Sequence, residues 1–297
     1  MSVRPRRIHA IDELQSQVRQ WRAAGERIAL VPTMGCLHAG HLRLVEVAAE
    51  HADRVVVSIF VNPLQFAAGE DLDRYPRTLD ADCDALAATP CAVVFAPEEQ
   101  ALYPRGREGL TVVQVPEISA RYCGAFRAGH FEGVTTVVNI LLNLVQPDVA
   151  VFGEKDWQQL FLIRRMVRDL WLPVDIVGVP TVREADGLAM SSRNRYLDAP
   201  ARAQAAQFPR VLDALVADLQ ARPEVPLAPR LAQAAAALRE QGLHVQYLDL
   251  VTERFAAVQE LDAGEYQLLA AVEVGSARLI DNRRVVICAP AGVVSPL

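Results

Sequence analysis

The sequence predicts an α/β protein with a Rossmann-like parallel sheet domain and a smaller α+β domain at the carboxyl end. Short apolar runs, typical of strands buried on both faces of a parallel sheet, alternate with helix-period segments through the first 185 residues. After that point the chain is rich in Ala, Leu, Gln and Arg, and strand-like runs follow two helical segments. We therefore expect domains at 1–185 and 186–297.

The first domain is expected to contain five main helices and five main strands. Apolar residues at helical spacing predict helices over 10–24, 41–51, 78–88, 134–145 and 157–170. Runs rich in β-branched residues predict strands over 27–32, 55–61, 91–96, 148–152 and 175–179, with a shorter strand at 112–115. Strands that alternate with helices in this way indicate a parallel sheet.

The second domain is expected to contain helices over 199–221 and 228–241. Strands of a smaller sheet are expected over 245–251, 267–274 and 278–281. The proline-punctuated residues 285–297 are expected to form a loosely held tail.

Composition limits the class of protein. With 297 residues and a formal net charge of −6, the surface repels a nucleic-acid backbone, so no nucleic-acid partner is expected. Five cysteines without C-x-x-C spacing argue against a disulfide framework or a zinc ribbon and favour a reducing, cytoplasmic compartment. No apolar stretch of about 18 residues occurs, and Asp12 and Glu13 interrupt any amino-terminal signal core, so neither a membrane partner nor a signal peptide is expected.

The segment 32–41, PTMGCLHAGH, lies between an expected strand and an expected helix. Ligands of open α/β sheets bind outside the carboxyl ends of strands, and a helix amino terminus offers N–H groups to an anion. Gly35 and Gly40 permit close backbone approach, and His38 and His41 can donate to a phosphate. Two alternatives stay open: the histidines only cap the helix, or they bind zinc, although no third ligand is evident.

The segment 186–194, DGLAMSSRN, follows the last expected strand of the first domain. The hydroxyls of Ser191 and Ser192 and the guanidinium of Arg193 can surround a polyphosphate. The alternative is a polar surface loop with a capping serine. Taken together, H-x-G-H early and M-S-S-R late in the sheet resemble the paired signatures of the nucleotidyl-transfer superfamily, which includes the class I aminoacyl-tRNA synthetases.

Two further loops carry polar side chains at strand ends. Lys155 follows Gly153 after the strand at 148–152 and can approach a phosphate as a compact charge. Asn62 and Gln65 follow the strand at 55–61 and suit a small ligand with hydroxyl and carboxylate groups. The alternatives are a surface lysine and a turn around Pro63.

Several segments, in this order, resemble the pantothenate synthetase family. The matching segments are PTMGCLHAGH at 32–41, FVNPLQF at 60–66, DLDRYPR at 71–77, FRAGHFEGVTTVV at 126–138, FGEKDWQQL at 152–160, MSSRN at 190–194 and RLIDN at 278–282. The chain departs from the family's usual pattern at Cys36, Ala67 and Ala128, none of which is a candidate catalytic residue.

The resemblance implies a role for each matching residue. His41 matches the residue assigned as proton donor, His38 a phosphate-contacting partner, and Lys155 a triphosphate-binding residue that completes the catalytic set. Gln65 would contact pantoate and β-alanine, and Gln159 pantoate, with Asn62 and Tyr75 as lesser contributors. ATP would contact Met34, Gly35, Cys36, Leu37, His38, Ala39, Gly40, His41, Gly153, Glu154, Lys155, Asp156, Val182, Met190, Ser191, Ser192 and Arg193.

The resemblance also implies the reaction. Pantoate and ATP would form pantoyl adenylate and pyrophosphate, and β-alanine would then give pantothenate and AMP. Family members are usually homodimers that use Mg²⁺, and we expect no protein-held metal site. The second domain would act as a lid hinged near residue 185. The alternatives are a nucleotidyltransferase that keeps AMP on a small acceptor, a tRNA synthetase fragment, and an inactive nucleotide-binding paralogue.

Overall fold

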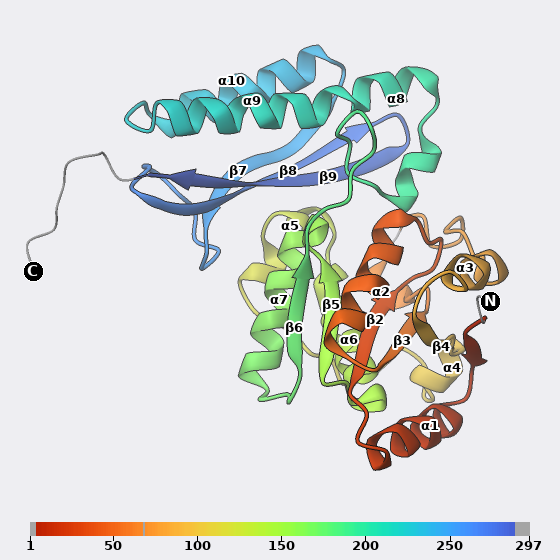
Figure 1. Cartoon of the computed structure of the whole chain (residues 1–297). Coiled ribbons are helices and arrows are strands. Elements are labelled where there is room, and N and C mark those ends of the chain that lie inside the picture. Colours follow the sequence, from red (N-terminus) through yellow and green to blue (C-terminus); the bar gives the residue numbers. More distant parts are fainter. Residues whose placement is uncertain (1–3, 68, 289–297) are drawn as a thin grey trace, which may run out of the picture. The chain divides into compact units, whose positions relative to one another are not determined.

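The structure is a computed structural model that describes residues 4–67 and 69–288 (Figure 1). The chain divides into two compact units, Met1–Val182 and Arg183–Leu297. Among the helices in the described ranges, none has the length and apolar character needed to cross a membrane.

The first unit is built on a six-stranded sheet in which every pair of neighbours is parallel, so the expected parallel sheet is confirmed. The strand order is β1-β4-β3-β2-β5-β6. The chain therefore proceeds from β2 toward one edge and returns beside β2 to build the other, which makes β2 and β5 the point where the order reverses. The strands are β1 (Arg6–Ile8), β2 (Ile28–Thr33), β3 (Arg54–Ile59), β4 (Cys91–Phe95), β5 (Val149–Gly153) and β6 (Asp175–Val179).

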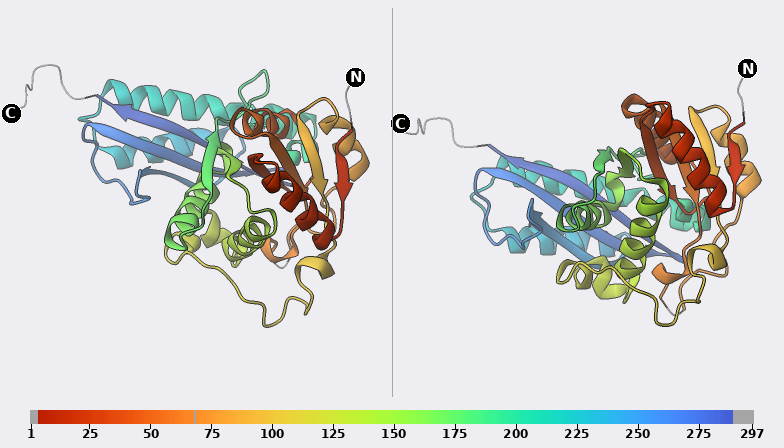
Figure 2. Two further views of the ribbon diagram at one scale, coloured as in Figure 1. Left: turned by 60° about the horizontal axis from the view of Figure 1, so that its bottom comes forward. Right: turned by 90° about the horizontal axis from the view of Figure 1, so that it is seen from below.

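Helices cover both faces of this sheet, which Figure 2 shows from two further sides. On one face, α2 (Ala39–His51) and α3 (Leu79–Leu86) contribute to a core with alternate residues of the strands, including Val45 and Val57. On the other face, α6 (His130–Val145) packs against α1 (Ile11–Ala23) and α7 (Trp157–Asp169). Two single-turn helices, α4 (Glu99–Leu102) and α5 (Cys123–Phe126), lie in the connections.

Two expectations for the first unit differ from the structure. The short strand at 112–115 is wrong, because the main chain of Val113 bonds instead to the hydroxyls of Thr135 and Thr136 on α6. The strand β1 was not expected: it has only three residues, two of them arginines, and it pairs with β4 at the edge of the sheet.

The second unit has a three-stranded antiparallel sheet, which confirms the smaller α+β domain. Its strands are β7 (His244–Thr252), β8 (Gly264–Val274) and β9 (Ala277–Ile287), and its helices are α8 (Ala199–Ala205), α9 (Gln207–Ala221) and α10 (Leu227–Glu240). Buried residues of helices and strands form one core, which includes Phe208, Leu238 and Leu268.

The single helix expected over 199–221 is wrong, since α8 and α9 are separate and meet at Ala206. Pro209 explains the break, because proline lacks an N–H group and its ring crowds the carbonyl four residues earlier. The expected tail is wrong for 285–287, where Val285 and Ile287 of β9 are buried in the core. Residues 289–297 of that expected tail lie outside the described residues.

Candidate active site

The carboxyl ends of parallel strands share one edge of the sheet, so the loops that follow β2, β3, β5 and β6 lie along that edge. The first unit thus brings together most of the residues that the sequence singled out. Residues 34–41 follow β2, residues 62–65 follow β3, residues 153–156 follow β5, and Val182 follows β6.

His38 and His41 cap the amino terminus of α2 reciprocally. The His38 Nδ1 atom accepts from the Gly40 N–H at 3.1 Å, and the His41 Nδ1 atom accepts from the His38 N–H at 3.3 Å. The two ring centroids are 4.1 Å apart. Because Nδ1 is the acceptor in both rings, each neutral imidazole carries its hydrogen on Nε2. Both histidines therefore cap the helix, and capping uses only one nitrogen of each ring.

Gly40 is required by this arrangement. A Cβ atom at Gly40 would lie 2.9 Å from His38 Cε1 and 3.0 Å from its Nδ1, so any side chain would displace the ring. The same Cβ position lies 3.9 Å from Val182 Cβ, which places Val182 beside the start of α2. The glycine of H-x-G-H thus makes room for the imidazole that caps its own N–H.

The pKa of His41 is lowered to about 3. Burial is the largest cause, because removing the ring from water disfavours its charged form, and His38 and the Lys155 ammonium lower it further. This effect of Lys155 also means that the lysine following β5 lies near the histidine following β2. His41 is therefore a neutral imidazole at neutral pH. Its Nε2–H can donate a hydrogen bond, but the ring is not in the imidazolium form.

Lys155 lies in a single 3₁₀ turn, Glu154–Asp156, between β5 and α7. Its ammonium lies 3.7 Å from the Asp156 carboxylate, and its side chain is one-fifth exposed. Gly153, just before it, has an extended backbone and open space where a Cβ would project. The Glu154 carboxylate lies over Gly178 of β6. A ligand can therefore approach the backbone at Gly153 beside a cation.

Asn62 and Gln65 form a buried amide cluster with their neighbours. The Asn62 amide donates to Gln65 Oε1 at 3.1 Å and to the Gly133 carbonyl at 3.0 Å, while its oxygen accepts from the Tyr103 hydroxyl at 2.7 Å. The Gln65 amide nitrogen lies 3.0 Å from Met34 Sδ, which ties this cluster to the loop after β2. Asn62 thus fixes the side chain of Gln65 through a hydrogen bond to its amide oxygen. The amide nitrogen of Gln65 faces Met34 in the loop after β2.

His130 and Arg127 hold the main chain of Gln65 in place, although the sequence gave neither residue a role. The Gln65 carbonyl accepts from His130 Nδ1 at 2.8 Å and from Arg127 at 3.2 Å. Arg127 also donates to His130 Nε2 at 2.8 Å and forms a two-pronged ion pair with Glu70 at 2.7 Å on each prong. The segment 126–138 contributed to the resemblance, but pairing across more than 50 residues has no local sequence signal.

The two glutamines at the start of α7 have different surroundings. Gln158 is buried, and its side chain bonds to the backbone of Ile118, Arg121 and Cys123. Gln159 is half-buried and takes no part in that bridge. Tyr75 is buried, with its ring edge-on to Phe66 at 5.8 Å. Of the two glutamines, Gln158 is thus used in a structural bridge, and Gln159 is more accessible.

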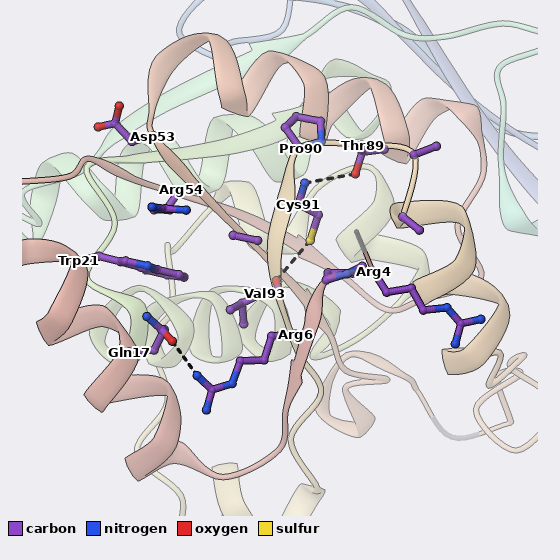
Figure 3. Close-up of a pocket in the computed structure, with 14 residues that line it drawn as sticks. Arg4, Arg6, Gln17, Trp21, Asp53, Arg54, Thr89, Pro90, Cys91 and Val93 are labelled. Carbon is purple, nitrogen blue, oxygen red and sulfur yellow. Dashed lines mark hydrogen bonds between the residues drawn. The ribbon is translucent and has the colours of Figure 1, made fainter. Parts of the chain in front are cut away.

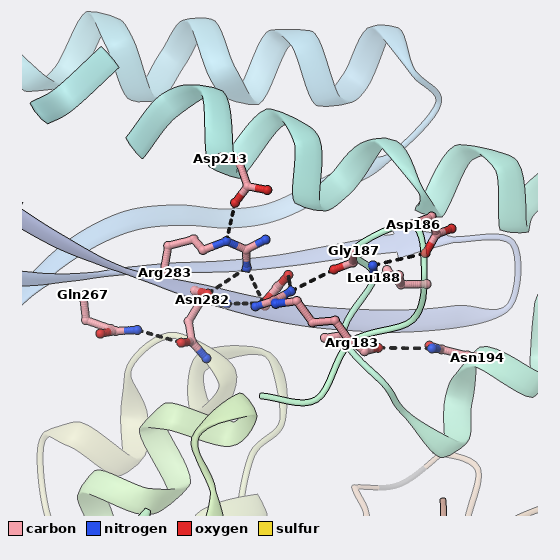
Figure 4. Close-up of polar contacts among 11 residues, drawn as sticks. Arg183, Asp186, Gly187, Leu188, Asn194, Asp213, Gln267, Asn282 and Arg283 are labelled. Atoms are coloured by element: carbon pink, nitrogen blue, oxygen red, sulfur yellow. Dashed lines mark hydrogen bonds and ion pairs between the residues drawn. The ribbon is translucent and has the colours of Figure 1, made fainter. Parts of the chain in front are cut away.

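Met190–Arg193 belongs to the second unit, where ion pairs and hydrogen bonds anchor the segment that carries it (Figure 4). Arg183 forms two bonds with the buried carboxylate of Asp281, at 2.8 and 3.0 Å, and Arg283 donates to the same carboxylate at 2.9 Å. Asn194 donates to the Ala189 carbonyl at 3.1 Å. The Ser191 hydroxyl accepts from the Arg193 N–H, so the expected capping role of this serine is present.

A separate cavity of about 560 Å³ lies at the amino ends of β1, β3 and β4 (Figure 3). Its lining includes Arg6, Trp21 and Arg54, but Arg6 is paired with Glu13 and Arg54 with Glu26. This edge is opposite to the one that carries His38, His41 and Lys155, so the cavity has no part in their chemistry.

The described residues contain no group of three or more His, Cys, Asp or Glu side chains arranged to hold a metal ion. The cysteines are all free thiols: Cys36, Cys83, Cys91 and Cys123 are buried, and Cys288 is exposed. Along the carboxyl edge of the sheet lie neutral imidazole and amide groups and the Lys155 ammonium, with the carboxylates of Glu154 and Asp156 beside it.

Comparison with known proteins gives one consistent result. The family described as Pantoate-beta-alanine ligase matches residues 6–284. A pantothenate synthetase of Shewanella amazonensis is 53% identical over 92% of this chain and 96% of its own length, and one of Pseudomonas aeruginosa is 52% identical over 93% and 97%.

Solved structures agree. A pantothenate synthetase structure from Thermus thermophilus matches with a TM-score of 0.86 at 44% identity, covering 94% of this chain and 98% of its own. A pantoate-beta-alanine ligase structure from Francisella tularensis, complexed with Beta-gamma ATP and Beta-alanine, matches with a TM-score of 0.79 at 32% identity, covering 94% and 97%.

Proposed function

This chain belongs to the pantoate-beta-alanine ligase family, and from that premise we propose how its residues carry out the reaction. The protein is an enzyme, a ligase that forms pantothenate from pantoate and β-alanine. ATP is its energy-supplying substrate, a proposal supported by the Francisella relative, whose structure is a complex with Beta-gamma ATP and Beta-alanine.

In the first step, an oxygen of the pantoate carboxylate attacks the α-phosphorus of ATP. The bond from that phosphorus to the bridging oxygen breaks, and pyrophosphate leaves with the electron pair. A carboxylate is already nucleophilic at neutral pH, so this step needs in-line positioning and neutralisation of phosphate charge more than a base. The product is pantoyl adenylate, a mixed anhydride.

In the second step, the neutral amine of β-alanine attacks the acyl carbonyl. The bond from the acyl carbon to the AMP oxygen breaks, AMP leaves with that oxygen and the electron pair, and the proton that the amine loses passes to the departing phosphate group. Water must be kept from the anhydride until the amine arrives. The buried amides of Asn62 and Gln65 support a largely enclosed acyl site.

The roles of the side chains follow from their chemistry. His38 and His41 donate Nε2–H groups to phosphate oxygens, and the Lys155 ammonium neutralises charge on the triphosphate. Gln65 contacts pantoate and β-alanine, Gln159 contacts pantoate, and Asn62 and Tyr75 shape the pocket. Within the first unit, the nucleotide is proposed to contact residues 34–41, 153–156 and 182. The observation that carries this proposal is the neutral His41 with Lys155 close by, at the point where the strand order reverses.

Mg²⁺ is proposed to enter with the triphosphate. Magnesium commonly keeps several waters and binds through substrate phosphates plus one or two carboxylates. The half-exposed Asp156 carboxylate beside Lys155 fits this mode, because it could supply one such ligand. The ion would supply charge neutralisation on the phosphates.

We also propose a cytoplasmic homodimer, by analogy with the family. Five free thiols suit a reducing compartment. The mass measured by light scattering tests the dimer: twice 32.6 kDa is expected, and the mass of a single chain would contradict it.

Purified protein with ATP, Mg²⁺ and pantoate tests the function. Exchange of labelled pyrophosphate into ATP is expected without β-alanine, and equal amounts of AMP and pantothenate are expected once β-alanine is added. AMP that stays attached to the product would instead indicate a nucleotidyltransferase, and no turnover at all would indicate an inactive relative.

A further inference from the structure

A carboxylate is buried directly behind the loop that carries the histidine pair. Asp82, on α3, is 3% exposed. Its Oδ2 accepts from the Cys36 N–H at 3.0 Å, and its Oδ1 accepts from the Leu37 N–H at 2.8 Å. The Thr78 hydroxyl donates to Oδ2 at 3.1 Å, and the Asp82 N–H returns a bond to the Thr78 carbonyl at 2.8 Å.

The loop conformation explains why two N–H groups meet at one point. Gly35 and Cys36 have consecutive left-handed φ values of 82° and 53°. In a turn of this kind, successive N–H groups point to the same side and form a small concavity that binds anions. Here the protein's own Asp82 carboxylate occupies that concavity. A Cβ at Gly35 would lie 3.0 Å from Asp82 Oδ2, so the glycine also permits the close approach.

The consequence concerns where phosphate can bind. The Cys36 and Leu37 N–H groups donate to Asp82, the Gly35 N–H donates to Thr33 Oγ1, and the Gly40 N–H donates to His38. The sequence suggested that this loop offers its backbone to an anion, as phosphate-binding loops do. In the structure these N–H groups already donate to acceptors within the protein. A phosphate at this loop would therefore be bound by side chains instead.

We propose that Asp82 is a positioning residue: it occupies the anion-binding concavity of the Gly35–Leu37 loop and thereby fixes the His38–His41 pair that meets the phosphates. Leu37 directly precedes His38, the residue that caps α2, so any shift of the loop reaches both imidazoles. The inference rests on the proposed function, because it assigns a purpose to holding those rings. A misplacement of about 1 Å can cost about 100-fold in rate.

Asp82→Asn is the test. An asparagine offers one acceptor oxygen, and its NH₂ group must face one of the donors from Cys36, Leu37 or Thr78. One buried N–H then loses its partner, which disfavours the native loop conformation. We expect kcat to fall by about 10- to 100-fold, with KM for ATP close to wild type. Hydrogen exchange of the Cys36 and Leu37 amides should accelerate.

Two controls separate positioning from simple loss of stability. Leu14→Ala removes a fully buried side chain from α1 and should lower the urea midpoint of the protein while keeping kcat. Asp80→Asn removes an exposed carboxylate from the same helix as Asp82 and should leave kcat and loop exchange unchanged. If Asp82→Asn keeps the wild-type kcat, or if Leu14→Ala loses kcat as much, the inference is overturned.

Thr78→Val carries the test if Asp82→Asn does not fold. It removes one donor to the carboxylate and keeps the charge, so a smaller fall in kcat with faster exchange at Cys36 and Leu37 is expected. Wild-type kcat and wild-type exchange in this variant would overturn the inference. Failure of the proposed function gives a different result, since the wild-type protein would then make no pantothenate while the exchange measurements still report on Asp82.

Discussion

The neutral state of His41 makes a specific prediction about its replacement. A pKa of about 3 means that at pH 6.5 the ring carries a second proton in only about one molecule in 3,000, and that charging it costs about 5 kcal/mol. The form of His41 present near neutral pH is therefore the neutral ring, and in the proposed function it donates through Nε2–H. Glutamine keeps a neutral N–H donor near that position, and alanine keeps none.

We expect His41→Ala to lose about 10²–10³ in kcat, as removal of one preorganised donor does elsewhere. His41→Gln should recover a clear part of that loss. Pyrophosphate exchange with pantoate is the assay, because it omits the amine of β-alanine. The kcat/KM profiles of wild type and His41→Gln should have the same shape between pH 5 and 8. A limb with a midpoint between pH 5.5 and 7.5 that only the wild type shows would refute a neutral His41.

The pH dependence of the free energy of unfolding tests the low pKa of His41 independently. Between pH 6.5 and about 3 the unfolded chain binds a proton at His41 that the folded chain does not, so stability falls as pH falls. This loss of stability has an upper limit of about 1.4 kcal/mol per pH unit, because only one proton is involved. Urea denaturation should show a shallower decline in His41→Gln below pH 6.5, and parallel declines would contradict the low pKa.

Three further variants follow from the geometry. Lys155→Ala should lose about 10²–10³ in kcat with an unchanged urea midpoint, and near-normal turnover would remove Lys155 from the catalytic set. Gly133→Ala should destabilise the first unit and raise KM for pantoate, because its Cβ would lie 2.3 Å from the carbonyl oxygen of Leu64; wild-type values of both would contradict this packing. Asp281→Asn should lower the stability of the second unit by about 3–5 kcal/mol in urea, since it leaves the charge of Arg183 without its buried partner, and a shift below about 1 kcal/mol would argue against that role.

The sequence predicted β2, β3, β4 and β5 well because most of their residues are buried. Strands such as β3 and β5 are buried on both faces and therefore consist mainly of continuous apolar residues. The loop that follows each strand lies at the carboxyl end of the sheet, because the strands are parallel. This parallel arrangement explains why His41 and Lys155, more than 100 residues apart, could be expected at one edge of the sheet.

Contacts between distant polar residues could not be predicted in the same way. Asp82 sits in an ordinary helical sequence, and only the folded loop 45 residues earlier shows what its carboxylate binds. His130 likewise acts on the Gln65 carbonyl across 65 residues. The capping role of His38 was foreseeable from its place before a helix, but the consequence that both imidazoles keep hydrogen on Nε2 required their hydrogen-bond partners.

The path of one oxygen atom tests the central claim most directly. Pantoate labelled with ¹⁸O in both carboxylate oxygens is turned over with ATP and β-alanine, and the products are analysed by mass spectrometry. If the carboxylate attacks the α-phosphorus and AMP leaves from the acyl carbon, each AMP gains one ¹⁸O and each pantothenate keeps one. AMP without label, or label in inorganic phosphate formed alongside ADP, would contradict a pantoyl adenylate intermediate.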